Sequence, residues 1–484
     1  MATQTASGAR GRKAIALASR PGIDDERSDG TEPGDRVRPT VKPQRMSAVR
    51  GPVLTYTGDP FQQGLGSTMR YEADAIVAMA DGRITHFGPA RQVRTLLPRG
   101  TRVEEYGKNA LISAGFIDCH VHFPQTPIIG AYGAQLLDWL NKYTFVAEQR
   151  FTDRAYARSV AQVFLRESLR NGVTTSAVHC TVHPQSVDAL FTEASRLGQR
   201  IIAGKVLMDR NAPAALLDTA RRGYDDSRAL IEKWHGKGRL LYAITPRFAA
   251  TSTPEQLAAA GRLWREYPDS FVQSHVAENK REVAWVKELF ARRKGYLDVY
   301  DHYRLLGPRA IYGHGIWLTE SELRRCHDTQ TAIAHCPTSN FFLGSGSLNL
   351  GRTTRRDRPV RVGLATDLGA GTSFSVLHTM GEAYKAAQSH GYALSAGHAF
   401  YLATRGAAQA LHLDDKIGSI APRMEADLVV LDLKSTPLID YRMKYAESLE
   451  EALFIQMTLA DDRAILATYV AGRRVYEGAV VQSR

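Results

Sequence analysis

Eight short apolar or β-branched runs recur through the middle of the chain, with stretches of helical character between most of them. The runs are Leu111–His122, Val173–His179, Arg200–Met208, Leu240–Phe248, Phe271–His275, Ala310–His314, Thr331–His335 and Val362–Asp367. The helical stretches include Ala155–Arg170, Pro254–Tyr267 and Glu282–Arg293. Strands that alternate with helices favour a parallel sheet, and eight such units favour its closure into a barrel. The pattern therefore predicts an α/β fold of the (β/α)₈ TIM-barrel type.

Both ends of the chain carry further strand-like segments with a different spacing. Those near the start are Arg50–Tyr56, Tyr71–Ala80 and Arg83–Phe87, and those near the end are Asp427–Leu433, Ala464–Val470 and Arg474–Tyr476. Asp81-Gly82 stands between two of these segments and is typical of a hairpin turn. We therefore expect a small β-sandwich domain that is assembled from both chain ends.

These patterns divide the chain into four parts. Residues 1–45 are rich in Gly, Pro, Ser, Arg and Asp and lack apolar periodicity, which predicts a disordered tail. The small β-domain is expected to comprise residues 46–110 and 416–484, and the barrel residues 111–415. Met46 precedes the first folded segment and is a candidate start residue. An intact mass that includes residues 1–45 in the natively expressed protein would contradict this hypothesis.

Composition narrows the class of protein. The hydrophobic fraction of 44% and the charged fraction of 23% are ordinary for a soluble globular protein. No run of 18 apolar residues is present, so no membrane span is expected. The net charge of +12 is spread without a dense basic run among aromatics, which argues against a nucleic-acid partner. Four scattered cysteines and the absence of a secretory signal favour a cytoplasmic protein.

Polar residues gather at the ends of the apolar runs. In barrels of this kind, the catalytic groups lie at the C-terminal ends of the strands. The residues found there are His120, His122, Arg247, His275, His314 and Asp367. Their positions predict a single site at the mouth of the barrel.

Three histidines and one aspartate have the composition of a metal site. His120 and His122 are two apart on a strand and face the same side. With His275 and Asp367 they offer three imidazoles and one carboxylate, which suit Zn²⁺ with an open position for water. Fe²⁺ or Mn²⁺ can use the same ligand types. The alternative roles are a helix N-cap for Asp367 and a buried core histidine for His275.

Five residues near these ligands offer acid–base and substrate-binding chemistry. Glu278, three residues after His275, can carry a proton between water and substrate. His314 can polarise the water or stabilise a developing oxyanion, although a core histidine is the alternative. Arg247 presents a planar donor fork, Phe248 a face for a flat heterocycle, and Gln125 an amide that donates and accepts.

Four other polar residues are predicted to stay outside the chemistry. His179 and His183 flank Cys180 and imitate a metal cluster, but the ligand set above has no vacancy after the second run. A structural or loop role is expected for both. His335 is expected near the barrel mouth without binding metal, and Glu282 is expected to be a solvated helix residue.

The motifs taken together carry a family resemblance. They are Gly115-Phe116-Ile117-Asp118-Cys119-His120-Val121-His122-Phe123-Pro124-Gln125, Leu136-Leu137-Asp138-Trp139-Leu140, Pro246-Arg247-Phe248, Ser274-His275-Val276-Ala277-Glu278-Asn279, Gly313-His314-Gly315 and Ala365-Thr366-Asp367. From about residue 48 to its end, the chain resembles the guanine deaminases of the amidohydrolase superfamily. The His-x-His, His and Asp pattern marks the superfamily, and Pro-Gln with Pro-Arg-Phe points to guanine.

The resemblance implies a zinc-dependent hydrolysis of guanine to xanthine and ammonia in a homodimer. It implies one zinc ion per chain, with Fe²⁺ as the alternative, held by His120, His122, His275 and Asp367. It implies Glu278, His314 and Asp367 as catalytic residues and Gln125, Arg247, Phe248 and His314 as guanine contacts. It also places Leu136–Tyr143 over the pocket, with plain core packing as the alternative.

Two other functions stay open at this level. One is a deaminase or hydrolase of another amino-heterocycle, such as 8-oxoguanine, a pterin or a triazine. The other is a non-catalytic barrel scaffold that has lost the metal, although the intact ligand set argues against it.

Overall fold

A computed structural model describes residues 46–133 and 135–478. Its larger sheet contains the predicted parallel strands in the order β14-β13-β12-β11-β10-β8-β7-β6, with the short β9 beside β10. The strands are β6 (Phe116–His122), β7 (Val173–His179), β8 (Arg200–Gly204), β9 (Val206–Leu207), β10 (Leu240–Pro246), β11 (Phe271–Val276), β12 (Ala310–His314), β13 (Ala332–His335) and β14 (Val362–Leu364). The predicted tail and the hypothesis about Met46 as a start residue concern residues outside this range.

The first and last strands of this sheet approach each other and close the barrel. The backbone N–H of Asp367, just after β14, donates to the carbonyl of His120 in β6, at 2.9 Å. The pairing of β6 with β7 shifts its register between Asp118 and Val121, so a bulge surrounds His120. Bulges of this kind re-aim a side chain. The predicted (β/α)₈ barrel is confirmed.

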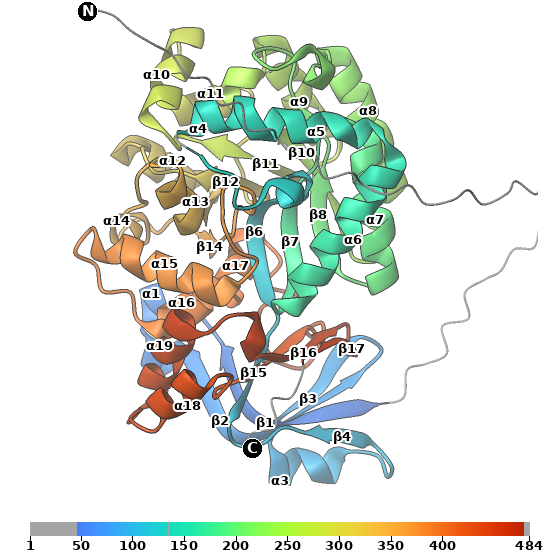
Figure 1. The fold of residues 1–484 in the computed structure, drawn as a ribbon, viewed down its shortest axis with the longest axis vertical. Helices are drawn as coiled ribbons and strands as arrows, with labels where there is room; N and C mark the ends of the chain where they lie inside the picture. Colours follow the sequence, from blue (N-terminus) through green and yellow to red (C-terminus); the bar gives the residue numbers. More distant parts are fainter. Residues whose placement is uncertain (1–45, 134, 479–484) are drawn as a thin grey trace, which may run out of the picture. The chain divides into compact units, whose positions relative to one another are not determined.

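Helices follow the strands and surround the sheet (Figure 1). They are α6 (Arg154–Arg170), α7 (Pro184–Leu197), α8 (Ala220–Trp234), α9 (Pro254–Glu266), α10 (Lys280–Leu289), α11 (Tyr296–His302), α12 (Glu320–Thr329), α13 (Pro337–Phe342), α14 (Leu350–Thr353), α15 (Val376–Gln388), α16 (Ala396–Leu402) and α17 (Arg405–Ala410). Their starts follow from the sequence: the Asp153 side chain accepts the backbone N–H groups of Ala155 and Tyr156 and begins α6. Buried apolar residues of α6–α12 join those of the strands in one cluster, whereas those of α14–α17 belong to two others.

The small β-domain combines the two chain ends, as predicted. Its sheet has the order β17-β16-β15-β5-β1-β2-β3, with β4 beside β1. The strands are β1 (Ser47–Tyr56), β2 (Met69–Ala80), β3 (Arg83–Pro89), β4 (Arg102–Glu105), β5 (Ala110–Ala114), β15 (Leu428–Asp432), β16 (Ile465–Val470) and β17 (Arg473–Glu477). Asp81 and Gly82 have φ of 50° and 77°, as the tight hairpin turn between β2 and β3 requires. The α-helices outside the barrel and its connection from β6 to α6 are α1 (Pro60–Gln63), α2 (Leu65–Thr68), α3 (Ala90–Val93), α18 (Pro437–Met443) and α19 (Leu449–Leu459).

One sequence prediction about the strands is wrong. The first apolar run, Leu111–His122, is two strands in two different sheets: β5 pairs with β15 and β1, and β6 belongs to the barrel. Gly115 lies between them, and a Cβ there would come within 2.3 Å of Thr174 Oγ1. The chain can change sheets here because glycine permits this close approach. The domain boundaries stay a prediction, because the described residues belong to one unit.

A chain of short helical turns connects β6 to α6. It comprises the 3₁₀ helix η2 (Phe123–Ile128), α4 (Leu136–Trp139), the π-helical turn η3 (Leu140–Thr144), α5 (Phe145–Glu148) and the 3₁₀ helix η4 (Gln149–Thr152). In the view of Figure 1, α4 and α5 are drawn in the same region as β10 and β11. We call Leu136–Glu148 the covering segment. Within the described ranges, no helix is long and apolar enough to cross a membrane.

Candidate metal centre and active site

The four predicted metal ligands lie together at the C-terminal ends of the barrel strands. The Nε2 atoms of His120 and His122 lie 3.2 and 3.1 Å from Nε2 of His275. Asp367 Oδ1 lies 3.5 Å from His120 Nε2 and 3.4 Å from His122 Nε2. The Nε2 atoms of His120 and His122 therefore lie close to both His275 and Asp367. One divalent ion could contact all of them.

The electrostatics of the cluster suit metal binding. The pKa values of His120, His122 and His275 are well below the usual value, mainly because the three rings are buried. These imidazoles are therefore neutral and offer lone pairs. The Nδ1–H of His275 lies 2.6 Å from the carbonyl oxygen of Arg247, which directs Nε2 to the cluster. Nδ1 of His122 has no hydrogen-bond partner among the described residues. The donor set fits a divalent ion such as Zn²⁺.

Two of the site residues stand on unusual backbone. His314 has φ of 72° and Asp367 φ of 47°, in the left-handed region that side chains other than glycine rarely adopt. Such conformations cost about 1–3 kcal/mol each and collect at functional sites. Gly313 is required for a different reason, since a Cβ there would lie 2.8 Å from Cε1 of His120. The backbone therefore gives up stability to aim these side chains.

Glu278 is held beside the cluster by two partners. Ser345 donates its hydroxyl to Oε1 at 3.0 Å, and Nε2 of His314 lies 3.4 Å from Oε2. Burial raises the pKa of Glu278 to about 7. A carboxyl group with this pKa can both take and release a proton at neutral pH.

His314 is oriented by Asn340, at the last turn of α13. The Asn340 amide oxygen lies 2.8 Å from Nδ1 of His314. Because an amide oxygen only accepts, Nδ1 carries the hydrogen. Nε2 then faces the carboxylates of Glu278 and Asp367, the latter at 3.9 Å. Neither Asn340 nor Ser345 was predicted from the sequence, because no spacing signal connects them to the site.

A cavity lies beside the cluster, with about 430 Å³ of empty space when the part open to solvent is included. Its lining joins the predicted site residues to part of the covering segment: His122, Gln125, Leu136, Trp139, Leu140, Arg247, Phe248, His275, Glu278, Glu282, His314, Leu343, Asp367 and Ala370. Gln125, Arg247 and Phe248 thus line the same cavity as the ligands. Of the segment Leu136–Tyr143, which the resemblance places over the pocket, Leu136, Trp139 and Leu140 line this cavity and also pack in a hydrophobic cluster.

Arg247 is tied to the covering segment by a buried ion pair that the sequence analysis missed. Its Nη1 donates to both carboxylate oxygens of Glu148, at 2.9 and 2.8 Å. Arg247 is 2% exposed and Glu148 is fully buried. The available signal was the single acidic residue in the otherwise apolar Phe145-Val146-Ala147-Glu148. A buried carboxylate requires a partner, and here that partner lines the pocket.

The prediction for Glu282 is wrong. Its side chain is 1% exposed and lines the cavity. Oε2 accepts the backbone N–H groups of Glu278 and Asn279, and the hydroxyl of Tyr296 donates to Oε1 at 2.5 Å. Glu282 is the N3 residue of a capping box that starts α10. Because the first turn of α10 borders the cavity, the Glu282 side chain is shielded from solvent.

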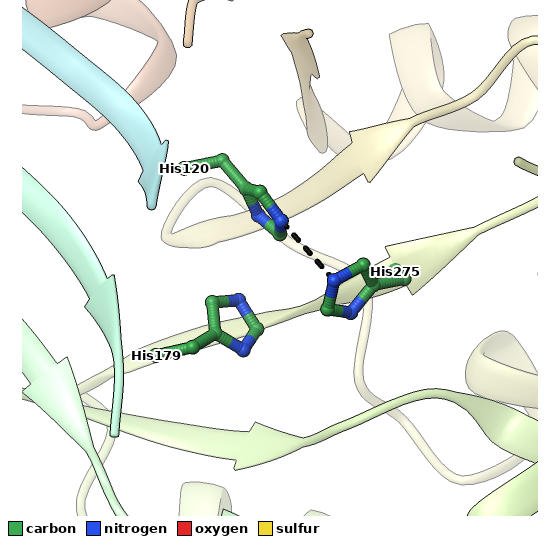
Figure 2. Close-up of side chains that lie close together, drawn as sticks. All are labelled: His120, His179 and His275. Carbon is green, nitrogen blue, oxygen red and sulfur yellow. Dashed lines mark hydrogen bonds between the residues drawn. The ribbon is translucent and has the colours of Figure 1, made fainter. Parts of the chain in front are cut away.

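The structure also places His179 differently from the sequence interpretation. His179 ends β7 opposite His122 in the strand pairing, and it is fully buried. Figure 2 shows its ring beside those of His120 and His275. His183 is partly buried and His335 is buried, and neither belongs to a metal-capable group among the described residues. Of the three histidines that the sequence set aside, His179 alone joins such a group in this part of the chain.

Comparison with known proteins agrees with this fold. Residues 111–475 match the model of the amidohydrolase family. The chain is 50% identical to the guanine deaminase of Escherichia coli K12 over 434 residues, which cover 89% of this chain and 98% of the relative. The solved E. coli guanine deaminase superposes with a TM-score of 0.87, over 89% of this chain and 99% of that one.

A further solved structure carries a ligand. The guanine deaminase of C. acetobutylicum with bound guanine in its active site has a TM-score of 0.80 and 28% identity, and the match covers 89% of this chain and all of that one. The barrel, the strand-end cluster and these matches show that the chain belongs to the amidohydrolase family. The similar proteins named above are, within that family, guanine deaminases.

Proposed function

We propose that this chain is a guanine deaminase, which hydrolyses guanine and water to xanthine and ammonia. The observation that carries the proposal is the 50% identity to a guanine deaminase over nearly the full length of that relative. The cavity supports it, because Gln125, Arg247 and Phe248 share its lining with the cluster. A flat, polar-edged heterocycle matches this combination of an aromatic face and donor groups.

We propose that His120, His122, His275 and Asp367 hold one ion per chain. Zn²⁺ is the expected metal because three imidazoles and a carboxylate suit it, and Fe²⁺ uses the same ligand types. A divalent ion held by these residues would lower the pKa of a water toward about 7 and would so supply hydroxide at neutral pH. The neutral state of the three histidines and their mutual distances support this assignment.

Glu278 is the proposed proton carrier. Its Oε2 atom would take one proton from the attacking water and give it to a ring nitrogen of guanine. It would then take the second proton from the hydroxyl group left on the ring carbon and give it to the amine, which departs as ammonia. A pKa of about 7 supports this role, because the carboxyl group can hold or release the proton without a large energetic cost. His314 stands between Glu278 and Asp367 and is placed to stabilise the charge that develops on the attacking oxygen.

Arg247, Gln125 and Phe248 are the proposed guanine contacts. Guanine offers a carbonyl and ring nitrogens as acceptors, which the guanidinium and amide groups can serve. Gln125 is held closely, since a Cβ on Gly369 would lie 2.0 Å from its Oε1 atom. Trp139 and Leu140 of the covering segment limit the access of water to this side of the pocket.

We further infer that the enzyme is a cytoplasmic homodimer. The four cysteines are free and buried, which suits a reducing compartment. The dimer rests on the family resemblance and is tested by sedimentation equilibrium of the purified protein. A monomer at micromolar concentration would contradict it.

The decisive experiment measures ammonia release together with metal content. Guanine should be deaminated by protein that contains one equivalent of metal, while adenine, cytosine and 8-oxoguanine react more slowly. Faster release from another ring would reassign the substrate. Metal-free protein without activity on any of the four would support a scaffold instead.

A further inference from the structure

His179 lies at the end of β7, on a barrel strand that supplies none of the four ligands proposed above. We propose that His179 is an additional ligand of the metal centre, so that four imidazoles and one carboxylate surround the ion. This inference rests on the proposed metal-dependent function and extends it to a residue outside that ligand set.

Proximity is the first support. The ring centroid of His179 lies 4.6 Å from those of His120 and His122 and 4.9 Å from that of His275. The potential ligand atoms of His120, His179 and His275 all lie within 4.8 Å of one another. Figure 2 shows the three rings around a common space. One ion could therefore be reached from all three strands.

The second support is the lack of any other partner. Both ring nitrogens of His179 are buried and have no hydrogen-bond partner among the described residues. A neutral imidazole keeps a lone pair on one of its two ring nitrogens. A buried imidazole without a partner is unfavourable, and a metal ion would use that lone pair.

His335 provides a matched comparison within the chain. It ends another barrel strand, β13, and is also fully buried with no partner on either ring nitrogen in the part of the chain that is described. Yet His335 belongs to none of the groups there that could hold a metal. Burial of an unpartnered histidine therefore does not by itself place it near the ion.

A fifth side-chain donor has a chemical consequence. Catalytic zinc sites commonly use three protein ligands and a water, whereas Fe²⁺, Mn²⁺ and Co²⁺ accept more. With His179 as a ligand, we expect the centre to retain such ions more firmly than a four-ligand site would. Removing His179 should therefore weaken metal binding and change the coordination of the ion.

The test uses Co²⁺ as a probe, loaded into the full-length protein and into His179→Phe and His335→Phe. Competition with a chelator gives the dissociation constant, and the visible absorption reports the coordination of the ion. His179→Phe should weaken Co²⁺ binding at least about tenfold and change the spectrum. His335→Phe should leave both unchanged. His179→Gln, which is closer in polarity, repeats the measurement if the Phe variant does not fold.

Two results would overturn the inference, and they differ. If the His179 variants keep the affinity and spectrum of the wild type, His179 is not a ligand, and the proposed function is untouched. If the wild type itself binds no Co²⁺ at one ion per chain, both the inference and the metal-dependent function fail.

Discussion

The strand ends and the covering segment build two halves of one cavity in different ways. At the strand ends, polar side chains come from a hydrogen-bonded barrel, and even the backbone is fixed, as in the 2.9 Å bond from Asp367 to His120. The covering segment is a series of short helical turns that reaches the pocket through Trp139 and Leu140 and is held by the ion pair of Glu148. The barrel strands position the reactive side chains, whereas the covering segment encloses the cavity.

Arg247 joins the two halves. Its carbonyl oxygen accepts the Nδ1–H of His275 at 2.6 Å, and its side chain pairs with Glu148. One residue thus orients a proposed metal ligand through its backbone and anchors the covering segment through its guanidinium. Substitutions at the strand ends should therefore reduce metal content and turnover. Substitutions in the covering segment should mainly reduce substrate binding.

The largest effect is expected from His122→Ala. This change removes an imidazole from the cluster, so both the metal and the deamination of guanine should be lost. Metal content measured on the purified variant, with ammonia release from guanine, checks the prediction. His183→Ala is the control, because His183 belongs to no metal-capable group among the described residues. A fully active, metal-loaded His122→Ala enzyme would contradict the ligand set.

Glu278→Gln should keep the metal and lose turnover. The amide preserves the size of the side chain and its contact with Ser345 but carries no transferable proton. A positioned general acid or base contributes about 10²–10⁴-fold to the rate, so kcat should fall by that amount. Steady-state kinetics on metal-quantified protein measures it. Wild-type turnover in this variant would remove Glu278 from the mechanism.

On the covering side, Glu148→Gln should act on binding and stability. It leaves the Arg247 cation buried without its counter-ion, which costs about 3–5 kcal/mol in comparable pairs. KM for guanine should rise more than kcat falls, because the guanidinium loses the group that holds it. Thermal unfolding and kinetics test both effects, and Glu148→Asp should restore part of each.

A double substitution makes this test sharper. Arg247→Met with Glu148→Leu replaces the ion pair with apolar side chains of similar volume, which can recover the stability. It should not recover guanine affinity. If guanine still binds as in the wild type, Arg247 is not a substrate contact and the pair is purely structural.

Most of the strand-end half of the site could be predicted from the sequence. His275 and Asp367 each terminate an apolar run, and a barrel places such ends at one mouth. His179 obeys the same rule, but it was set aside because the ligand set had no vacancy. Its pairing opposite His122 depends on the shifted register of β6 and β7, which the sequence does not show. Counting ligands thus set aside a residue whose ring lies beside those of His120 and His275.

The covering half was less readable because its contacts join distant positions. Glu148 and Arg247 are separated by 99 residues, and no periodicity relates them. Glu282 is a different kind of failure: Asn279-Lys280-Arg281-Glu282 is a recognisable capping box. That signal fixes the start of α10 two residues before the predicted start. Local signals of this kind were available, whereas long-range pairing was not.

The smallest effect is expected from Glu282→Gln and appears as a change in pH dependence. Burial, followed by the charge of Glu278, raises the pKa of Glu282 from 4.5 to about 7. Between these values the folded protein holds a proton that the unfolded chain has released. The contribution to stability is therefore complete below pH 4.5 and is lost as the pH rises through 7.

Glutamine cannot release such a proton, so the variant should lose less stability than the wild type between pH 5 and pH 8. The difference is on the order of 1 kcal/mol for each unit of pKa shift. Urea unfolding at the two pH values measures it, with Glu255→Gln on the exposed side of α9 as the control. An equal decline in wild type and variant would mean that Glu282 is ionised in the folded protein. In that case the Glu282 side chain would accept the N–H groups of Glu278 and Asn279 as a carboxylate anion, and not as a neutral acid.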